Sequence, residues 1–313
     1  MNNAAAAMGD TALAAAPPSD VASLDEVGGR MSAFLTLTKP RIVLMELITV
    51  GVGFLLGARG SAHPGTLLAT LLGAALVAGG AGALNMVLER ERDARMRRTR
   101  RRPLPSGRLE PIEATVFGAS LGVSGTVLLL FGAGATAAAV AFATLVLYVW
   151  VYTPLKTRTT LNTAVGAIPG ALPPVIGWSA ATGTLGIEAW TLFLIVFLWQ
   201  FPHFLAIAWI AREDYERGGM KMLPCIDPQG FMTGRQATLH ALALVPAGLL
   251  PTVAGMAGAV YFVGALALGL FYLAASARFW ADVNDVNARK LLRASLLYLP
   301  AVLLLLVLNP LPA

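Results

Sequence analysis

Long apolar runs, separated by short polar segments, constrain this chain more than any other feature of its sequence. They recur along most of its 313 residues, and a run of about 18 to 20 apolar residues is long enough to cross a bilayer as a helix. Only 13% of the residues are charged, whereas roughly a quarter are charged in a soluble domain. Lipid requires every backbone polar group to be bonded internally, and the alternation typical of β-barrel strands is missing from the sequence. The sequence therefore predicts an all-α, polytopic membrane protein.

We predict nine transmembrane helices, which form one domain over residues 31–313 around a central cavity open toward the cytoplasm. The fifth helix contains Pro169, Pro173 and Pro174, so it is expected to be kinked or broken. Such breaks are tolerated where neighbouring protein or a cavity satisfies the freed backbone groups. The nine predicted spans are residues 42–58, 66–88, 112–131, 135–153, 163–181, 189–211, 237–255, 258–275 and 292–309.

The basic residues predict the orientation of these helices. Of the 23 Lys and Arg residues, all but Arg59 lie before or at the entry to the first span, or in and at the edges of the loops after the even-numbered spans. The positive-inside rule then places the N-terminus in the cytoplasm and the C-terminus outside a cell (inner) membrane. Residues 1–30 lack the basic segment and long apolar core of a signal peptide and are predicted to be a disordered cytoplasmic tail. We assign the net charge of +6 to topology and phosphate ligands, with no nucleic-acid partner.

A polar motif at the cytoplasmic end of the second span predicts the chemistry. Asn85, Glu89 and Asp93 are spaced four residues apart, so their side chains share one face of a helix. Mg²⁺ prefers one or two carboxylates together with water and substrate phosphate oxygens. Arginines follow immediately over residues 97–102, and guanidinium groups bind phosphate oxygens in pairs. The segment is thus typical of a metal–diphosphate site, although ion pairing and topology alone would also account for the charges.

Two further polar clusters are expected at the same membrane face. Tyr152, Lys156 and Arg158 follow the fourth span, and Asn162 comes shortly after them. Acidic residues, among them Asp214, follow the sixth span beside Lys and Arg.

These motifs resemble the UbiA superfamily of intramembrane prenyltransferases. The first acidic motif, from Asn85 to Asp93, and the following Arg-Pro-Leu-Pro segment carry the resemblance. Four segments are similar to the protoheme IX farnesyltransferase (heme O synthase) branch in particular. They are Lys39-Pro-Arg41, Tyr152-Thr-Pro-Leu-Lys156, Trp199-Gln-Phe-Pro-His203, and Glu213-Asp-Tyr215 with Met222-Leu-Pro224.

The chain departs from the superfamily pattern at two positions. The first motif usually has Asp at the position of Glu89, so the metal geometry is expected to differ. The second motif is commonly Asp-x-x-x-Asp, whereas Glu213 and Asp214 are adjacent here. A second metal ion is therefore less strongly indicated than the first.

The resemblance implies that the protein transfers farnesyl from farnesyl diphosphate to a vinyl group of heme b. Water is added, and heme O and diphosphate are formed. It implies Mg²⁺ as cofactor, heme b as substrate rather than resident cofactor, and a handover to a heme A synthase or to terminal oxidase assembly factors. The implied catalytic residues are Asn85, Glu89, Asp93, Lys156 and Asp214, of which all but Lys156 are metal ligands. The implied substrate-binding residues are Lys39, Arg41, Arg97, Arg98, Arg101, Tyr152, Arg158, Asn162 and His203.

Two ionisable residues inside predicted spans are further candidates, because such residues are costly in lipid and usually have a function. His203 is a candidate heme contact, and a hydrogen bond inside the bundle would explain it equally well. Glu46 is a candidate cavity carboxylate, with pairing to Arg41 or to a neighbour on its helix as the alternative.

Two other functions fit part of the pattern. A prenyltransferase of the same superfamily could act on a quinone precursor, but the heme-type segments argue against that acceptor. A transporter with a cytoplasmic phosphate-binding face would also have many spans. Its half-helices usually recur in two halves of the chain, and this sequence shows no such pair.

Overall fold

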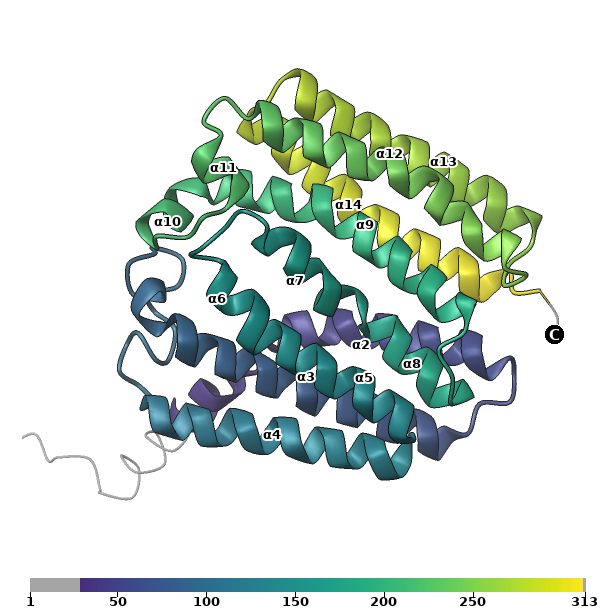
Figure 1. Cartoon of the computed structure of the whole chain (residues 1–313), viewed down its shortest axis with the longest axis horizontal. Coiled ribbons are helices and arrows are strands. Elements are labelled where there is room, and N and C mark those ends of the chain that lie inside the picture. Colours follow the sequence, from purple (N-terminus) through teal and green to yellow (C-terminus); the bar gives the residue numbers. More distant parts are fainter. Residues whose placement is uncertain (1–28, 312–313) are drawn as a thin grey trace, which may run out of the picture.

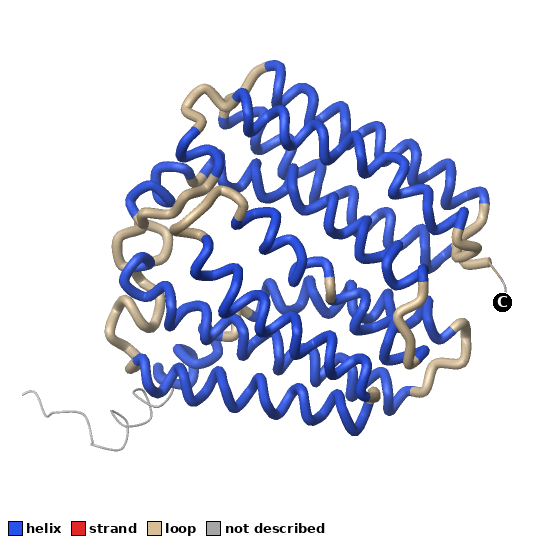
Figure 2. The backbone as a smooth tube through the Cα atoms, viewed as in Figure 1, coloured by secondary structure: helices blue, strands red, loops and turns tan. Residues whose placement is uncertain are grey.

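Helices make up nearly all the regular structure of the computed structural model, which describes residues 29–311 (Figures 1 and 2). Within this range, one isolated bridge between Ala257 and Pro310 is the only β-type pairing. Nine helical segments there are long and apolar enough to cross a membrane, which confirms the all-α class and the predicted number of spans. They are α2 (Pro40–Ala58), α3 (Pro64–Asp93), α4 (Pro111–Gly132), Ala135–Leu155, Asn162–Thr182, α9 (Ile187–Ile210), α12 (Phe231–Val253), α13 (Ala259–Ala281) and α14 (Asp285–Leu308).

The predicted disordered tail falls almost entirely outside the described residues. Its last two residues, 29 and 30, belong to a helical stretch over 29–37 that precedes α2.

The outer surface of the bundle is apolar. Large side chains such as Phe131, Val253 and Leu308 are 84%, 80% and 70% exposed. Soluble monomers rarely expose apolar patches larger than a few hundred Å². These side chains therefore indicate a surface that faces lipid.

Two of the nine spans are irregular. Ala135–Leu155 consists of α5 (Ala135–Val146), the π-helix η1 (Leu147–Tyr152) and α6 (Thr153–Leu155). Asn162–Thr182 is divided at Leu172 into α7 (Asn162–Ala171) and α8 (Pro173–Thr182). Proline has no amide hydrogen and is favoured in the first turn of a helix, so Pro173 ends one helix and begins the next. The predicted break in the fifth span is confirmed.

Close contact of α2 with α8 depends on glycine. A Cβ atom on Gly177 would lie 1.9 Å from the backbone oxygen of Val50, and one on Gly53 would lie 2.1 Å from that of Pro174. Only glycine permits backbones to approach this closely. The two helices form adjoining walls of the cavity described below.

The two ends of the bundle differ in their loops. The loop over 94–110, the end of α6, and the short helices α10 (Arg212–Arg217) and α11 (Leu223–Ile226) gather at one end, on the left in Figure 1. We call this the basic end, because most of the described Lys and Arg residues lie in these segments and around them.

Candidate active site

Three polar side chains of α3 form the centre of the candidate site. Asn85, Glu89 and Asp93 are 1%, 4% and 0% exposed. The helix continues through Asp93, so all three lie on one face, as their spacing predicts. Buried polar groups require partners, and these partners define the site.

Each of the three residues has its own cation, supplied by a different segment of the chain. Lys39 Nζ donates to Asn85 Oδ1 at 2.7 Å. Lys156 Nζ lies 2.7 Å from Glu89 Oε1, and Arg102 donates to Asp93 Oδ2 at 2.7 Å. We call these six residues the polar ladder. Its three cations come from the turn before α2, the residue after α6 and the loop over 94–110.

The ladder retains acceptor capacity that suits a divalent cation. Asp93 Oδ1 is buried and has no hydrogen-bond partner. Leaving such an atom unsatisfied costs about 1–3 kcal/mol. No group of three or more His, Cys, Asp or Glu side chains that could hold a metal occurs among the described residues. Two carboxylates and an amide nevertheless fit Mg²⁺, which completes its shell with water and phosphate oxygens.

Aromatic rings from the irregular fourth span surround two of the cations. Lys156 Nζ lies 4.7 Å from the centre of the Tyr152 ring, and Lys39 Nζ lies 3.5 Å from Tyr148 Oη. Asn85 Nδ2 donates to Thr153 Oγ1 at 3.0 Å, which fixes the orientation of the amide. All three partner residues belong to η1 and α6, and π-helical turns occur frequently at functional sites.

Lys39 has a strained backbone. Its φ of 53° and ψ of 56° lie in the left-handed region, which is uncommon for residues other than glycine and costs on the order of 1–3 kcal/mol. Burial, and then the charges of Lys156 and Arg102, lower the pKa of Lys39 to about 7. A diphosphate beside Lys39 would favour its charged form.

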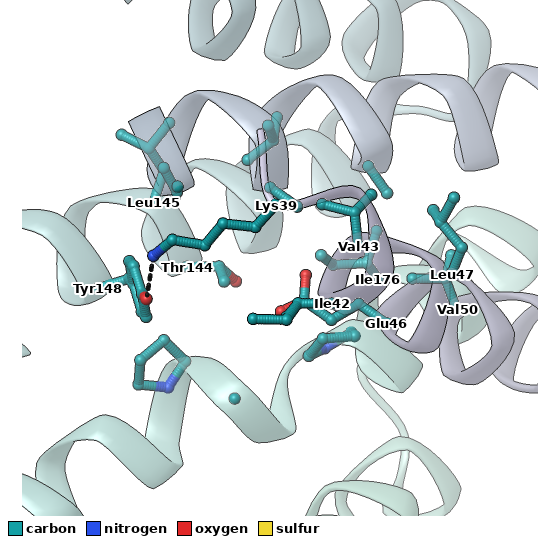
Figure 3. Close-up of a pocket in the computed structure, with 18 of the residues that line it drawn as sticks. Lys39, Ile42, Val43, Glu46, Leu47, Val50, Thr144, Leu145, Tyr148 and Ile176 are labelled. Carbon is teal, nitrogen blue, oxygen red and sulfur yellow. Dashed lines mark hydrogen bonds between the residues drawn. The ribbon is translucent and has the colours of Figure 1, made fainter. Parts of the chain in front are cut away.

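A cavity adjoins the ladder and extends into the bundle (Figure 3). Its polar end is formed by Lys39, Tyr148 and Tyr152, and most of its remaining lining is apolar. Glu46 and Gln200 are polar exceptions in the wall. The apolar lining side chains include Ile42, Val43, Leu47, Val50, Val77, Leu145, Ile176 and Phe204.

Two residues predicted for the site instead hold loops together. Asp214 accepts the backbone N–H groups of Arg97 and Arg98, each at 3.1 Å. Asn162 donates from Nδ2 to the backbone oxygen of Lys221 at 2.8 Å. These bonds shape the basic end, and the predicted ligand roles of Asp214 and Asn162 stay predictions.

Five of the predicted phosphate contacts lie at the protein surface. Their side chains are exposed and make no hydrogen bond or ion pair with any described residue. The guanidinium of Arg98 lies 5.8 Å from the centre of the Tyr215 ring. The five are Arg41, Arg97, Arg98, Arg101 and Arg158.

His203 is outside the lining of the cavity. Its Nδ1 lies 2.7 Å from Ser295 Oγ on α14, and its ring stacks on Trp199 at a centroid distance of 4.8 Å. Its predicted contact with heme therefore stays a prediction.

Three further residues of the site were not predicted from the sequence, namely Arg102, Tyr148 and Thr153. Arg102 is one of nine arginines between residues 90 and 108, and only the folded loop brings it to Asp93. Tyr148 precedes Tyr152 by four residues, so helical spacing would have placed both rings on one face.

Known proteins are similar to this chain over most of its length. The family model described as UbiA prenyltransferase family matches residues 47–299. A protoheme IX farnesyltransferase of Solibacter usitatus is 45% identical over 288 residues, which are 89% of this chain and 99% of that protein. Another, of Koribacter versatilis, is 40% identical over 305 residues, covering 94% and 96% of the two chains.

Solved structures share the fold at lower identity. Digeranylgeranylglyceryl phosphate synthase has a TM-score of 0.74 at 20% identity, covering 90% of this chain and 98% of that one. A UbiA homolog from Archaeoglobus fulgidus, bound to GPP and Mg²⁺, has a TM-score of 0.67 at 16% identity, covering 88% and 99%.

Proposed function

Because this chain belongs to the UbiA prenyltransferase family, we infer that it transfers the farnesyl group of farnesyl diphosphate to a vinyl group of heme b. Water is added to the acceptor, and heme O and diphosphate are the products. Relatives 40–45% identical over most of their length are protoheme IX farnesyltransferases. The observation that carries the inference is the polar ladder at the end of an apolar cavity.

The ladder cations would bind the diphosphate. Lys39, Arg102 and Lys156 converge on one face of α3, and fixed cations stabilise the negative charge that develops as diphosphate leaves. We propose that the exposed arginines add outer contacts as the substrate approaches. These are Arg41, Arg97, Arg98, Arg101 and Arg158.

Asn85, Glu89 and Asp93 would hold Mg²⁺, which when bound neutralises charge on the diphosphate. A solved structural neighbour binds GPP and Mg²⁺. Asp214 is proposed as a ligand of a second ion, bound through the lone pairs that remain beside its bonds from the Arg97 and Arg98 amides. Lys156, which pairs with Glu89, would also contact the departing diphosphate.

The apolar cavity would hold the farnesyl chain and keep bulk water from the reacting allylic carbon. Tyr152 lines its polar end and would pack against the first isoprene unit. We propose Asn162 and His203 as further substrate contacts. Their contributions to binding should be smaller than those of the ladder cations, because both side chains already have partners within the protein.

The activity is tested with membranes that contain the protein, heme b, farnesyl diphosphate and Mg²⁺. We expect a heme product heavier by one farnesyl group and one hydroxyl group, lost with a chelator and in Asp93→Asn. Asp285→Asn is the matched control, because Asp285 pairs with Arg212 away from the cavity. Prenylation of a hydroxybenzoate instead of heme b would contradict the proposed acceptor.

We propose that the basic end faces the cytoplasm, because it carries most of the Lys and Arg residues. A Cys225→Ser protein has no other cysteine, and Glu91→Cys then adds one at a residue whose side chain is 75% exposed. An impermeant maleimide should label it in inside-out vesicles and not in right-side-out vesicles. The reverse pattern would overturn the orientation.

Because heme O carries an added farnesyl chain, we propose that it is handed over within the membrane to a heme A synthase or to terminal oxidase assembly factors. Crosslinking in native membranes, with mass spectrometry of the captured proteins, tests this handover.

A further inference from the structure

Glu46 is an ionisable side chain in the wall of the cavity, away from the ladder. It lies in the second turn of α2, seven residues after Lys39, which precedes the helix. Both side chains line the same cavity. Figure 3 shows the Glu46 carboxyl group extending between apolar side chains into the space that Lys39 enters from the polar end.

The other polar side chains of the deep cavity have partners within the protein. Thr144 Oγ1 donates to the backbone oxygen of Val140 at 2.8 Å. Gln200 Nε2 donates to the backbone oxygens of Ala167 and Val196. The Glu46 carboxyl group forms no hydrogen bond or ion pair with any residue in the range 29–311. The side chain is only half-buried, and this carboxyl group is therefore free to bind water or a ligand in the cavity.

The reaction proposed above requires a water molecule at one carbon in an apolar chamber. The bond between farnesyl C1 and the diphosphate oxygen breaks, and diphosphate leaves with the electron pair. The π electrons of the heme vinyl group form the new bond from its terminal carbon to C1. The adjacent carbon, attached to the porphyrin, is left positively charged. Water adds there through oxygen and must lose one proton to give the hydroxyl group.

A water molecule in an apolar cavity needs polar partners to remain ordered, and its proton needs an acceptor within hydrogen-bond reach. Besides Glu46, no Asp, Glu or His side chain lines this cavity in the described part of the chain. A carboxylate also stabilises a nearby cation in a low-dielectric site. Resting on the proposed function, we propose that Glu46 is the catalytic base that orients this water and accepts its proton during hydration of the farnesylated vinyl group.

Loss of the base should change the product and not only the rate. Without directed hydration, the cation loses a proton from the neighbouring carbon, which carries two hydrogens after farnesyl transfer. The product is then a farnesylated alkene, lighter than heme O by one water. Both products release one diphosphate, so diphosphate counts farnesyl transfer and the mass of the heme counts hydration.

The test compares Glu46→Gln, Glu46→Asp and wild type in membranes supplied with heme b and farnesyl diphosphate. Glu188→Gln is the matched control, because Glu188 faces Arg59 at the other end of the bundle. In Glu46→Gln we expect heme O formation to fall about 100-fold, the range of a lost general base. Anhydro product should account for most of the remaining farnesylated heme. Glu46→Asp keeps a carboxylate one methylene further back, so it should restore part of the hydration.

Three outcomes would overturn the proposal. The first is a Glu46→Gln enzyme that makes heme O at the wild-type rate. The second is an equal loss of diphosphate release and heme O with no anhydro product in either Glu46 variant, which would assign Glu46 to binding or folding. The third is wild type that forms no farnesylated heme, which removes the proposed function together with this inference. Thermal unfolding of each variant in detergent identifies a folding defect. If Glu46→Gln has such a defect, the ratio of heme O to anhydro product in Glu46→Asp decides whether Glu46 directs hydration.

Discussion

Two partly buried polar clusters, both within the membrane-spanning bundle, differ in the way their atoms are satisfied. The polar ladder pairs cations with carboxylates and an amide, leaves Asp93 Oδ1 free, and reaches the cavity through Lys39. The second cluster joins α9 to α13 and α14 and consists of Trp199, His203, Tyr272 and Ser295. In it, Trp199 Nε1 donates to the Ser295 backbone oxygen at 2.9 Å, and Tyr272 Oη donates to the Trp199 backbone oxygen at 3.1 Å.

Burial of a polar side chain in a membrane therefore does not by itself identify a ligand site. In the second cluster, neutral groups satisfy one another across helices, and His203 already has Ser295 as a partner. In the ladder, charges of opposite sign meet at a cavity and acceptor capacity remains. Unused acceptor capacity beside a cavity is the property that distinguishes the ladder from the second cluster.

The largest effect should follow from removing a ladder charge. Glu89→Gln is expected to lower kcat about 100-fold, because an electrostatic group of the site is lost. Glu91 lies two residues away on α3, its side chain is 75% exposed, and within residues 29–311 it pairs only with Arg90, so Glu91→Gln should stay within about twofold of wild type. Steady-state formation of heme O measures both. Equal activity in the two variants would remove the functional distinction between the ladder and the surface.

A smaller effect should separate two adjacent arginines. Arg102→Gln removes the partner of Asp93 and is expected to lower kcat/KM for farnesyl diphosphate about tenfold, or about 1.4 kcal/mol. Arg101 is exposed, and Arg101→Gln should change it about twofold at most. A larger loss in Arg101→Gln than in Arg102→Gln would contradict the ladder as the diphosphate site.

The smallest effect should come from the second cluster and appear in stability. Ser295→Ala removes the hydroxyl bonded to His203 and should lower the free energy of unfolding by about 1 kcal/mol, with KM for heme b unchanged. Ser276→Ala is the control, since Ser276 Oγ donates only to Tyr272 within its own helix, and it should cost less. Thermal unfolding in detergent and heme titration provide the measurements. A raised KM for heme b in Ser295→Ala, without loss of stability, would show that the bond to Ser295 positions His203 for the proposed substrate contact and is not only structural.

Much of the fold could be predicted from the sequence because each span carries its own signal. Hydropathy identifies an apolar helix locally, and all nine predicted spans overlap observed ones. The start of the last span was placed seven residues too late, since α14 begins at Asp285 rather than residue 292. Its first two turns contain charged residues, which lower the local hydropathy. The helix nevertheless extends beyond the apolar run to its N-cap, where the Asn284 side chain accepts the Asn287 N–H.

The candidate site was predictable only where its geometry is local. The common face of Asn85, Glu89 and Asp93 follows from helical spacing alone. The selection of Arg102 over Arg101 depends on turns in the loop over 94–110, where Thr99 Oγ1 bonds the Asp93 backbone oxygen. The engagement of Asp214 with two backbone amides depends on a contact across more than 110 positions. Neither contact can be predicted from a periodic pattern in the sequence.

The origin of the ladder cations also bears on how the chain is inserted. Lys39, Arg102 and Lys156 reach α3 from segments before the first span, after the second and after the fourth. A helical hairpin inserted upside down would carry at least one of them to the opposite membrane face. Glu89 or Asp93 would then be left as a buried charge without a counterion, a defect that costs roughly 3–5 kcal/mol in proteins. The polar ladder thus favours the correct membrane topology, since its ion pairs form only when the first four spans have been inserted in the correct orientation.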